Sequence, residues 1–226
     1  MHTIIVANGE LGYPAAAKQQ LRSADFIIAA DGGLQHCLQL GLTPDLIVGD
    51  LDSIPDALLE KIQRDGAQVS RYPRRKDATD LELALLEAQQ SGHLEVTVLA
   101  AIGGRWDQSL ANLQLLSNPA FDDLNLKIVD GPQIAYRVRS GSPLTLNSRP
   151  GDTVSLIPVG GDVLGVRTAG LEYALDGDTL NHGSSRGVSN VMTGESAQIQ
   201  VEGGTLLCLL IRGGAGALEL DREGGF

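Results

Sequence analysis

The first half of the chain alternates apolar runs with helix-forming segments, and this alternation limits the folds open to it. Residues 26–30 and 46–48 are short apolar runs typical of buried strands. Strands that alternate with helices of this length indicate βαβ units and a largely parallel sheet. Strands are predicted at 3–7, 26–30, 46–48, 67–72, 96–101 and 124–129, and helices at 14–22, 34–40, 55–64, 77–90 and 108–116. We therefore predict an α/β, Rossmann-like domain with helices on both faces of the sheet.

The pattern changes near Gly131-Pro132. Beyond this point the sequence contains no convincing helix, and short runs of β-type residues are separated by Gly, Pro, Asn and Asp. These runs are 153–159, 163–168, 171–175, 188–192, 197–201 and 205–211. Such spacing predicts an antiparallel sandwich or barrel of about 80 residues. We expect an α/β domain at 1–132 and a β-sandwich domain at 133–226, with a frayed glycine-rich tail at 213–226.

Composition excludes some classes of partner. The chain has 17 basic and 28 acidic residues, a net charge of −11, which argues against a surface for nucleic acid or an anionic membrane. An anionic small ligand stays compatible, because a metal ion can supply the missing positive charge. The sequence shows neither a basic leader pattern nor an apolar stretch of about 18 residues. Cys37 and Cys208 lie in apolar surroundings and are expected to be buried thiols, so we expect a cytoplasmic protein.

Polar residues collect where the predicted strands of the first half end. If these strands are parallel, the polar groups share the carboxyl edge of the sheet, where open α/β sheets bind ligands. Four groups have this placement: Asp31-Gly32-Gly33, Gly49-Asp50-Leu51-Asp52-Ser53, Lys76-Asp77-Ala78-Thr79-Asp80 and Gly103-Gly104-Arg105-Trp106-Asp107-Gln108. Their convergence on one edge is the main sequence evidence for a functional site.

The pair of aspartates at 50 and 52 has two interpretations. A turn begun at Gly49 would aim Asp50 and Asp52 at one cation. Alternatively, Asp52 or Ser53 caps a helix that starts at Pro55. The sequence around these residues does not decide between a metal site and a helix cap.

Two other groups also have both a functional and a structural interpretation. Gly103 and Gly104 precede a helix, where backbone N–H groups would cradle a phosphate and Arg105 would grip it, although a double glycine also makes a simple tight turn. Thr79 and Glu82 fit the capping box of a helix N-terminus. Both interpretations stay open for each group.

Taken in order, these groups resemble the successive motifs of the thiamin pyrophosphokinase family. The resemblance extends to Pro44-Asp45 and Asn112, and then to Gly170-Leu171-Glu172-Tyr173-Ala174-Leu175 and Gly187-Val188-Ser189-Asn190, so it covers almost the whole chain. It implies an α/β catalytic domain, a C-terminal β-sandwich and a homodimer with sites at the subunit interface. It also implies transfer of a pyrophosphoryl group from ATP to the hydroxyl of thiamin, giving thiamin diphosphate and AMP.

The resemblance assigns roles to residues of this chain. Asp50, Asp52 and Asp80 are expected to bind a Mg²⁺ ion that bridges the phosphates of ATP. Arg105, with the amides of Gly103 and Gly104, is expected to hold the polyphosphate. The nucleotide and acceptor sites are expected to include Asp31, Gly32, Asp77, Thr79, Asp107, Gln108 and Asn112. Thiamin is expected to contact Tyr173, Ser189 and Asn190 of the other subunit.

One departure from the family pattern concerns the acceptor. The family usually has Trp where this chain has Tyr173, and Trp is the better cation–π partner for a thiazolium ring. We therefore expect weaker thiamin binding or a related hydroxylated heterocycle. Three alternatives stay open: a metal-dependent hydrolase of nucleotides or phosphate esters, a pyrophosphokinase of a pterin-like alcohol, and a non-catalytic thiamin or nucleotide sensor. The sequence identifies no general base.

Overall fold

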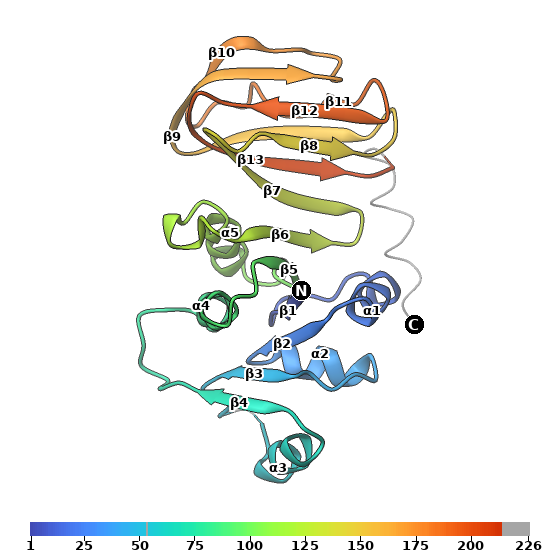
Figure 1. Ribbon diagram of the computed structural model, residues 1–226, viewed down its shortest axis with the longest axis vertical. Helices are drawn as coiled ribbons and strands as arrows, with labels where there is room; N and C mark the ends of the chain where they lie inside the picture. The colour runs from blue at the N-terminus through green and yellow to red at the C-terminus, as the bar shows by residue number, and fades with distance from the viewer. Residues whose placement is uncertain (53, 214–226) are drawn as a thin grey trace. The chain divides into compact units, whose positions relative to one another are not determined.

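The computed structural model describes residues 1–52 and 54–213, which divide into two compact units (Figure 1). The first unit contains Met1–Leu115 and Pro119–Gly131, and the second contains Leu116–Asn118 and the chain from Pro132 onward. Helices and strands alternate in the first unit, whereas strands dominate the second. The predicted mixed α/β composition is therefore confirmed.

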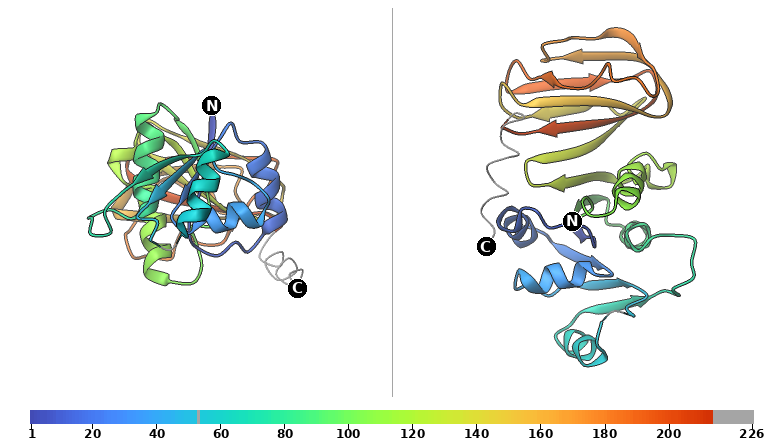
Figure 2. Two further views of the ribbon diagram at one scale, coloured as in Figure 1. Left: turned by 90° about the horizontal axis from the view of Figure 1, so that it is seen from below. Right: turned by 180° about the vertical axis from the view of Figure 1, so that it is seen from behind.

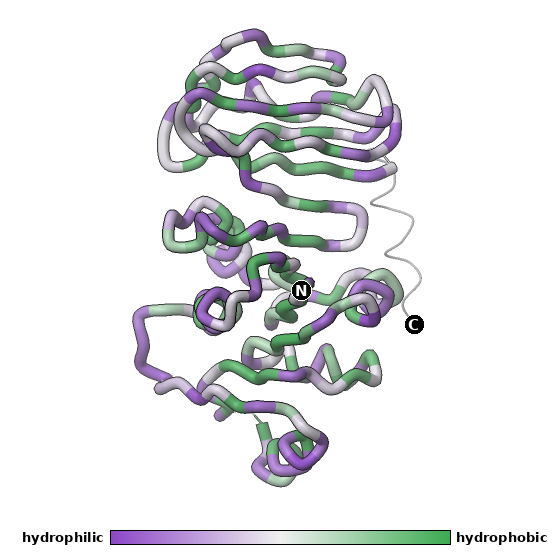
Figure 3. Tube along the Cα trace, viewed as in Figure 1, coloured by the Kyte–Doolittle hydropathy of each residue, from purple (hydrophilic) through white to green (hydrophobic). Residues whose placement is uncertain are grey.

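The first unit is built on a six-stranded parallel sheet. Across the sheet the strands are β4 (Gln68–Arg71), β3 (Leu46–Gly49), β2 (Phe26–Ala30), β1 (His2–Val6), β5 (Glu95–Leu99) and β6 (Asn125–Asp130). Apolar residues concentrate along these strands (Figure 3), and Ile4, Ile28 and Ile47 are completely buried. The chain lays β2, β3 and β4 on one side of β1, then returns to place β5 and β6 on the other. The direction of winding thus reverses between β1 and β5, where open α/β sheets bind ligands.

Helices cover both faces of this sheet. They are α1 (Pro14–Arg22), α2 (Gly33–Gln39), α3 (Asp56–Arg64), α4 (Asp80–Gln90) and α5 (Trp106–Leu115), with a short 3₁₀ helix at Pro119–Phe121. Right-handed crossovers put α1 and α2 on one face, and the reversal of winding puts α4 and α5 on the other (Figures 1 and 2).

Two element boundaries differ from the prediction for identifiable reasons. The helix expected from 77 begins at Asp80 because Thr79 is extended, with φ −71° and ψ 160°, and caps the helix. The Thr79 hydroxyl accepts a hydrogen bond from the Glu82 N–H at 3.2 Å, which confirms the cap. The strand expected at 96–101 ends at Leu99 because Ala100 has a left-handed φ of 52°.

The second unit is antiparallel. Its strands run in the order β7 (Gln133–Arg139), β13 (Gly203–Ile211), β9 (Thr153–Ala169), β12 (Ser196–Gln200) and β8 (Leu144–Asn147), and β10 (Asp176–Leu180) and β11 (Asn190–Val191) also pair with β9. The first half of β9 pairs with β13 and β11, and the second half pairs with β12 and β10. Between residues 132 and 213 the chain forms no helix, as predicted.

Several predictions for the second unit are wrong in detail. Residues 171–175 form no strand, and Leu171 makes only an isolated bridge with Met192. The strand expected at 188–192 is limited to β11, and the strands β7, β8 and β10 were not predicted. The predicted frayed tail lies outside the described residues except for Gly213, whose N–H donates to Oδ1 of Asp152 at 2.7 Å.

Both cysteines are buried free thiols, as predicted. Burial raises the pKa of Cys37 and that of Cys208 to about 12. None of the helices in the described residues has the length and apolar character that a membrane span requires.

Candidate active site

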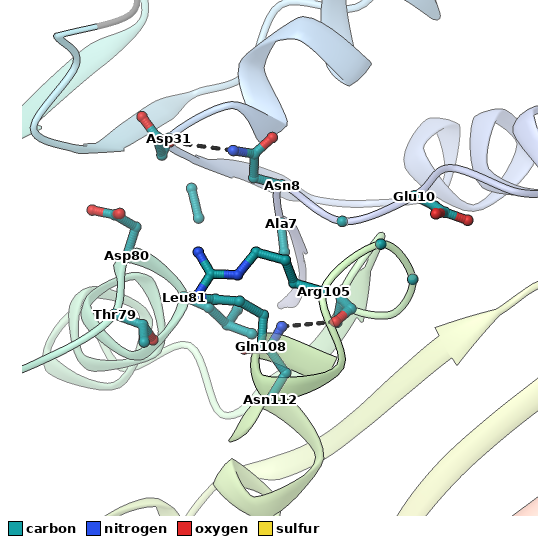
Figure 4. A pocket seen from close by; sticks show the side chains of 15 residues that line it. Ala7, Asn8, Glu10, Asp31, Thr79, Asp80, Leu81, Arg105, Gln108 and Asn112 are labelled. Carbon is teal, nitrogen blue, oxygen red and sulfur yellow. Dashed lines mark hydrogen bonds between the residues drawn. The ribbon is translucent and has the colours of Figure 1, made fainter. Parts of the chain in front are cut away.

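A cavity of about 460 Å³ lies at the carboxyl edge of the parallel sheet, where the winding reverses (Figure 4). The side chains and backbone that line it come from the ends of β1, β2 and β5 and from the starts of α4 and α5. They include Asn8, Gly9, Glu10, Asp31, Thr79, Asp80, Gly103, Gly104, Arg105, Gln108 and Asn112. Seven of the predicted donor-site residues besides Arg105 therefore line one cavity: Asp31, Thr79, Asp80, Gly103, Gly104, Gln108 and Asn112.

Gly49 allows two carboxylates to approach each other beside this cavity. A Cβ atom at Gly49 would lie 3.3 Å from Cβ of Asp31 and 3.3 Å from Oδ1 of Asp80, so only glycine fits here without displacing them. Burial raises the pKa of Asp31, and the negative charges of Asp80 and Asp50 raise it further. The structure thus places three of the acidic side chains close enough to interact.

Lys76 supplies positive charge at this acidic edge. Its Nζ lies 2.6 Å from Oδ1 of Asp80 and 5.9 Å from the centroid of the Tyr72 ring. The loop that carries Lys76 is in turn attached to α4, because the hydroxyls of Ser70 and Tyr72 both donate to Oε1 of Glu87. The ammonium group is therefore held against Asp80 rather than left in solvent.

Asp50 and Asp52 form a tight turn after β3. The Asp52 N–H donates to Oδ1 of Asp50 at 3.1 Å, and Leu51 between them has a left-handed φ of 60°. The residue that caps α3 is Pro55, and no side chain among the described residues caps the helix there, so the interpretation of Asp52 as a cap is wrong. Ser53 lies outside the described residues. Neither Asp50 nor Asp52 lines the cavity itself.

The glycine turn before α5 is ordered by its own contacts. Gly103 and Gly104 have φ angles of 101° and 66°, which side chains rarely allow. The Gly103 N–H donates to the Ser109 hydroxyl at 3.1 Å, so this amide is already used. Arg105 donates twice to the Asp107 carboxylate, at 3.1 and 2.5 Å. Both partners are exposed, so a phosphate would compete with Asp107 for the guanidinium group.

Some predicted site residues have a structural bond as well. Asn112 is buried and donates from Nδ2 to the Ala101 carbonyl at 2.7 Å, which fixes the turn after β5. Thr79 caps α4, as described above. The predicted residues outside the lining are Gly32, Asp50, Asp52, Asp77 and Asp107 in the first unit.

The sequence analysis missed the loop after β1. The N–H groups of Gly9 and Glu10 donate to carbonyls in the loop after β5, at 2.7 and 2.9 Å, so the two loops form one wall of the cavity. Nε2 of His36 lies 2.8 Å from the Gly9 carbonyl, and Asn8 donates to Oδ2 of Asp31 at 3.3 Å. Asn-Gly reads as an ordinary turn, and only the order of the strands reveals that this loop borders the switch point.

The predicted acceptor residues lie in the second unit. The Tyr173 side chain is on the surface, with 65% of the residue exposed, whereas Asn190 is 8% exposed. Ser189 has a left-handed φ of 63°, which is uncommon for a residue with a side chain. Non-glycine residues in this conformation cluster at functional sites, where the surroundings hold them in place.

Within residues 1–52 and 54–213 no group of three or more His, Cys, Asp or Glu side chains is arranged around a metal position. The chemistry of the acidic edge nevertheless suits Mg²⁺, because carboxylate oxygens are the ligands this ion prefers. Asp80 now has Lys76 as its cationic partner, and a divalent ion would replace or supplement that partner.

A cavity at the switch point of a parallel sheet, with carboxylates and a glycine turn before a helix, is typical of α/β proteins that bind phosphorylated ligands. Residues 17–128 match the family model for the catalytic domain of thiamin pyrophosphokinase, and residues 143–206 match the model for its vitamin B1 binding domain. The chain therefore belongs to the thiamin pyrophosphokinase family, as its motifs predict.

Individual relatives agree with this assignment. The chain is 27% identical over 163 residues to thiamine pyrophosphokinase of Bacillus subtilis, covering 72% of this chain and 76% of the relative. It is 25% identical over 235 residues to thiamine pyrophosphokinase 1 of Oryza sativa, covering 93% and 88%. The crystal structure of a thiamin pyrophosphokinase family protein from Enterococcus faecalis matches with a TM-score of 0.82 and 25% identity, covering 94% of this chain and 99% of that one.

Proposed function

We propose that the protein transfers the pyrophosphoryl group of ATP to the hydroxyl of thiamin, giving thiamin diphosphate and AMP. The observation that carries this proposal is the match to two models of one family, one for catalysis and one for vitamin B1 binding, in order along one chain. Relatives named thiamine pyrophosphokinase in bacteria and plants support the same reaction.

The donor site of this proposal lies at the cavity edge of the first unit. Asp50, Asp52 and Asp80 would hold Mg²⁺, which neutralises charge on the phosphate oxygens when bound. The proximity of Asp50 and Asp80 to Asp31, and the glycine at position 49, support this role. Arg105 would hold the polyphosphate in exchange for its present bond to Asp107. The amides of Gly103 and Gly104 would contribute in exchange for the bond from Gly103 to the Ser109 hydroxyl. Asp31, Gly32, Asp77, Thr79, Asp107, Gln108 and Asn112 would line the nucleotide and acceptor sites.

Positioning does most of the work in such a reaction. The thiamin hydroxyl attacks the β-phosphorus of ATP, the bond between the α- and β-phosphoryl groups breaks, and AMP leaves. Phosphoryl transfer needs little covalent help from protein, so a fixed approach of the hydroxyl and stabilisation of charge by Arg105 account for the chemistry. The hydroxyl proton leaves to solvent or to a phosphate oxygen, and no general base is assigned.

The acceptor site would come from the second unit of another copy of the chain. We propose a homodimer in which residues 1–132 of one subunit bind ATP and residues 133–226 of the partner bind thiamin through Tyr173 and Ser189. The second unit would be a β-sandwich divided between the two halves of β9, whose different partners support that arrangement. The two free, buried thiols support a cytoplasmic location.

Phosphorus NMR of the reaction mixture tests the function. Protein with Mg²⁺, ATP and thiamin should form AMP and thiamin diphosphate in equal amounts. ADP with thiamin monophosphate would contradict pyrophosphoryl transfer, and hydrolysis of ATP without thiamin would indicate a hydrolase. AMP release with a pterin alcohol, but not with thiamin, would show that the acceptor pocket has a different substrate.

A further inference from the structure

The backbone of Tyr173 is held by a single buried side chain. Its N–H donates to Oδ1 of Asn190 at 3.0 Å, and its carbonyl accepts from Nδ2 of the same residue at 2.8 Å. Oδ1 of Asn190 also accepts from the Val191 N–H at 2.9 Å. One amide group therefore bonds both polar backbone groups of Tyr173, across a separation of 17 residues along the chain.

The segment around Tyr173 is tied on both flanks. The Glu172 N–H donates to the Val191 carbonyl at 2.9 Å. On the other flank, the Leu175 N–H donates to the Thr168 hydroxyl at 2.9 Å, and the Thr168 N–H donates to the Leu175 carbonyl at 2.9 Å. Although residues 171–175 form no strand, hydrogen bonds on both sides of Tyr173 hold this segment against its neighbours.

Asn190 is in turn held in place by hydrogen bonds between the residues before it and strand β9. Ser189 donates its N–H to the hydroxyl of Ser155 at 3.0 Å, and Ser155 is a buried residue of β9. The Leu156 N–H donates to the Gly187 carbonyl at 2.8 Å, so the loop before Asn190 rests against β9. The left-handed φ of Ser189 is held in place by these bonds.

The Tyr173 ring contrasts with its backbone. Tyr173 is 65% exposed, and its hydroxyl makes no hydrogen bond within the described residues. An exposed aromatic ring on a fixed backbone loses little conformational entropy when a flat ligand stacks on it. The backbone is already ordered, so only the rotations of the side chain are restricted on binding. The geometry is that of a preorganised binding surface.

We infer that Asn190 is a positioning residue, which fixes the Tyr173 ring for the acceptor by binding the backbone of Tyr173. Asn190 is 8% exposed, its Oδ1 already accepts two hydrogen bonds, and one of its two Nδ2 protons is donated to the Tyr173 carbonyl. Its amide is therefore bonded to the backbone of the Tyr173 segment and is largely shielded from a substrate. In this inference the indirect role replaces the contact with thiamin that the family resemblance implies. The inference rests on the proposed function for the identity of the acceptor.

A double-mutant cycle tests this role in the full-length protein. Tyr173→Ala and Asn190→Ala should each raise KM for thiamin about tenfold, which is within the range of a cation–π contact. KM for ATP should change less than about twofold, and the double variant should be no worse than Tyr173→Ala alone. Effects that multiply would mean that Asn190 contacts the substrate itself, and loss of kcat alone would mean a structural role; either result overturns the inference.

A matched control and a second variant keep this test decisive. Asn181→Ala removes an exposed amide for which no side-chain bond exists within the described residues, and it should leave KM for thiamin unchanged. If Asn190→Ala does not fold, Asn190→Asp keeps the acceptor for the Tyr173 and Val191 N–H groups and replaces the donor with a carboxylate oxygen that repels the Tyr173 carbonyl. It should then show the same selective rise in KM.

Hydrogen exchange separates failure of this inference from failure of the proposed function. The Tyr173 amide should exchange at least about tenfold faster in Asn190→Ala than in the wild type, because it loses its acceptor. In the Asn181→Ala variant the Tyr173 amide should exchange at the wild-type rate. Unchanged protection in Asn190→Ala would overturn the inference whatever reaction the protein catalyses, and faster exchange supports the bond even if thiamin proves to be the wrong acceptor.

Discussion

Nζ of Lys76 lies 2.6 Å from Oδ1 of Asp80, and both side chains are partly buried, with 14% and 28% of their surface exposed. The ammonium group offsets negative charge at an edge where Asp31 and Asp50 also interact. A divalent cation bound by Asp80 would compete with this ion pair. The charge of Lys76 therefore affects how much a bound divalent cation adds to the stability of the acidic edge.

Replacing Lys76 should make the protein more dependent on Mg²⁺. Lys76→Ala leaves the carboxylates without their cation, and we expect the free energy of unfolding to fall by about 1–2 kcal/mol, equivalent to about 2–8 °C in Tm. Mg²⁺ should restore more of the Tm in this variant than it adds to the wild type. Thermal unfolding in EDTA and in increasing Mg²⁺ measures both effects.

The control for this prediction is Lys61→Ala, at an exposed position of α3. Equal Mg²⁺-induced shifts in all three proteins would contradict the prediction.

The three proposed metal ligands should be needed for turnover but not for folding. Asp50→Asn, Asp52→Asn and Asp80→Asn should each lower kcat by roughly 10²–10³-fold, the scale of losing one preorganised electrostatic group. Circular dichroism should show an unchanged fold, and Asp65→Asn, an exposed residue after α3, should retain full activity. Full activity of Asp80→Asn would reduce Asp80 to the partner of Lys76.

The parallel sheet could be predicted because its strands are decided locally. Runs such as 26–30 and 46–48 are apolar enough to be buried on both faces, and the structure has strands at both places. β10, with the sequence Asp-Gly-Asp-Thr-Leu, carries no such signal, because its pairing is provided by β9. Tertiary context decides such a strand, and the sequence of the segment alone does not.

The site was predictable to the extent that it depends on the ends of strands. Asp31, Asp80 and Arg105 line one cavity because parallel strands bring their loops to one edge. The bond between Asn190 and Tyr173 was not predictable, because it joins two loops through contacts that only the folded second unit creates. The sequence does not show that the amide of Asn190 is buried or that the ring of Tyr173 is exposed.

A buried carboxylate in the second unit should give stability that depends on pH. Burial raises the pKa of Asp152, but hydrogen bonds from the Ser148 hydroxyl and from the N–H groups of Arg149 and Gly213 outweigh burial, and the pKa lies below its usual range. A lowered pKa in the folded state stabilises the protein above the ordinary value of about 4. That stabilisation is lost as pH falls through the lower, folded-state pKa.

Asp152→Asn should therefore lower Tm at pH 7, by the equivalent of about 1–3 kcal/mol for a lost set of charged hydrogen bonds. The difference from the wild type should begin to shrink as pH falls below about 4, because the unfolded wild type then binds a proton that the folded state does not yet bind. Thermal unfolding between pH 7 and pH 3 measures the difference, with Asp65→Asn as the exposed control. A difference that is the same at every pH would show that the charge of Asp152 contributes nothing.

The proposed homodimer predicts that two impaired variants restore activity when their subunits are mixed. If each site takes Asp50 from one subunit and Tyr173 from the partner, a mixed dimer of Asp50→Asn and Tyr173→Ala contains one site with both residues intact. Random exchange of equal amounts makes half of the dimers mixed, so about a quarter of wild-type activity should return. The assay is run with thiamin below its wild-type KM, so that the Tyr173→Ala defect is fully expressed.

A mixture of Asp50→Asn and Asp52→Asn is the matched control, because both changes lie in the same unit and every mixed site keeps one defect. Native mass spectrometry of differently tagged subunits establishes that exchange has occurred. No recovery in the first mixture, with mixed dimers present, would mean that each site is built within one chain.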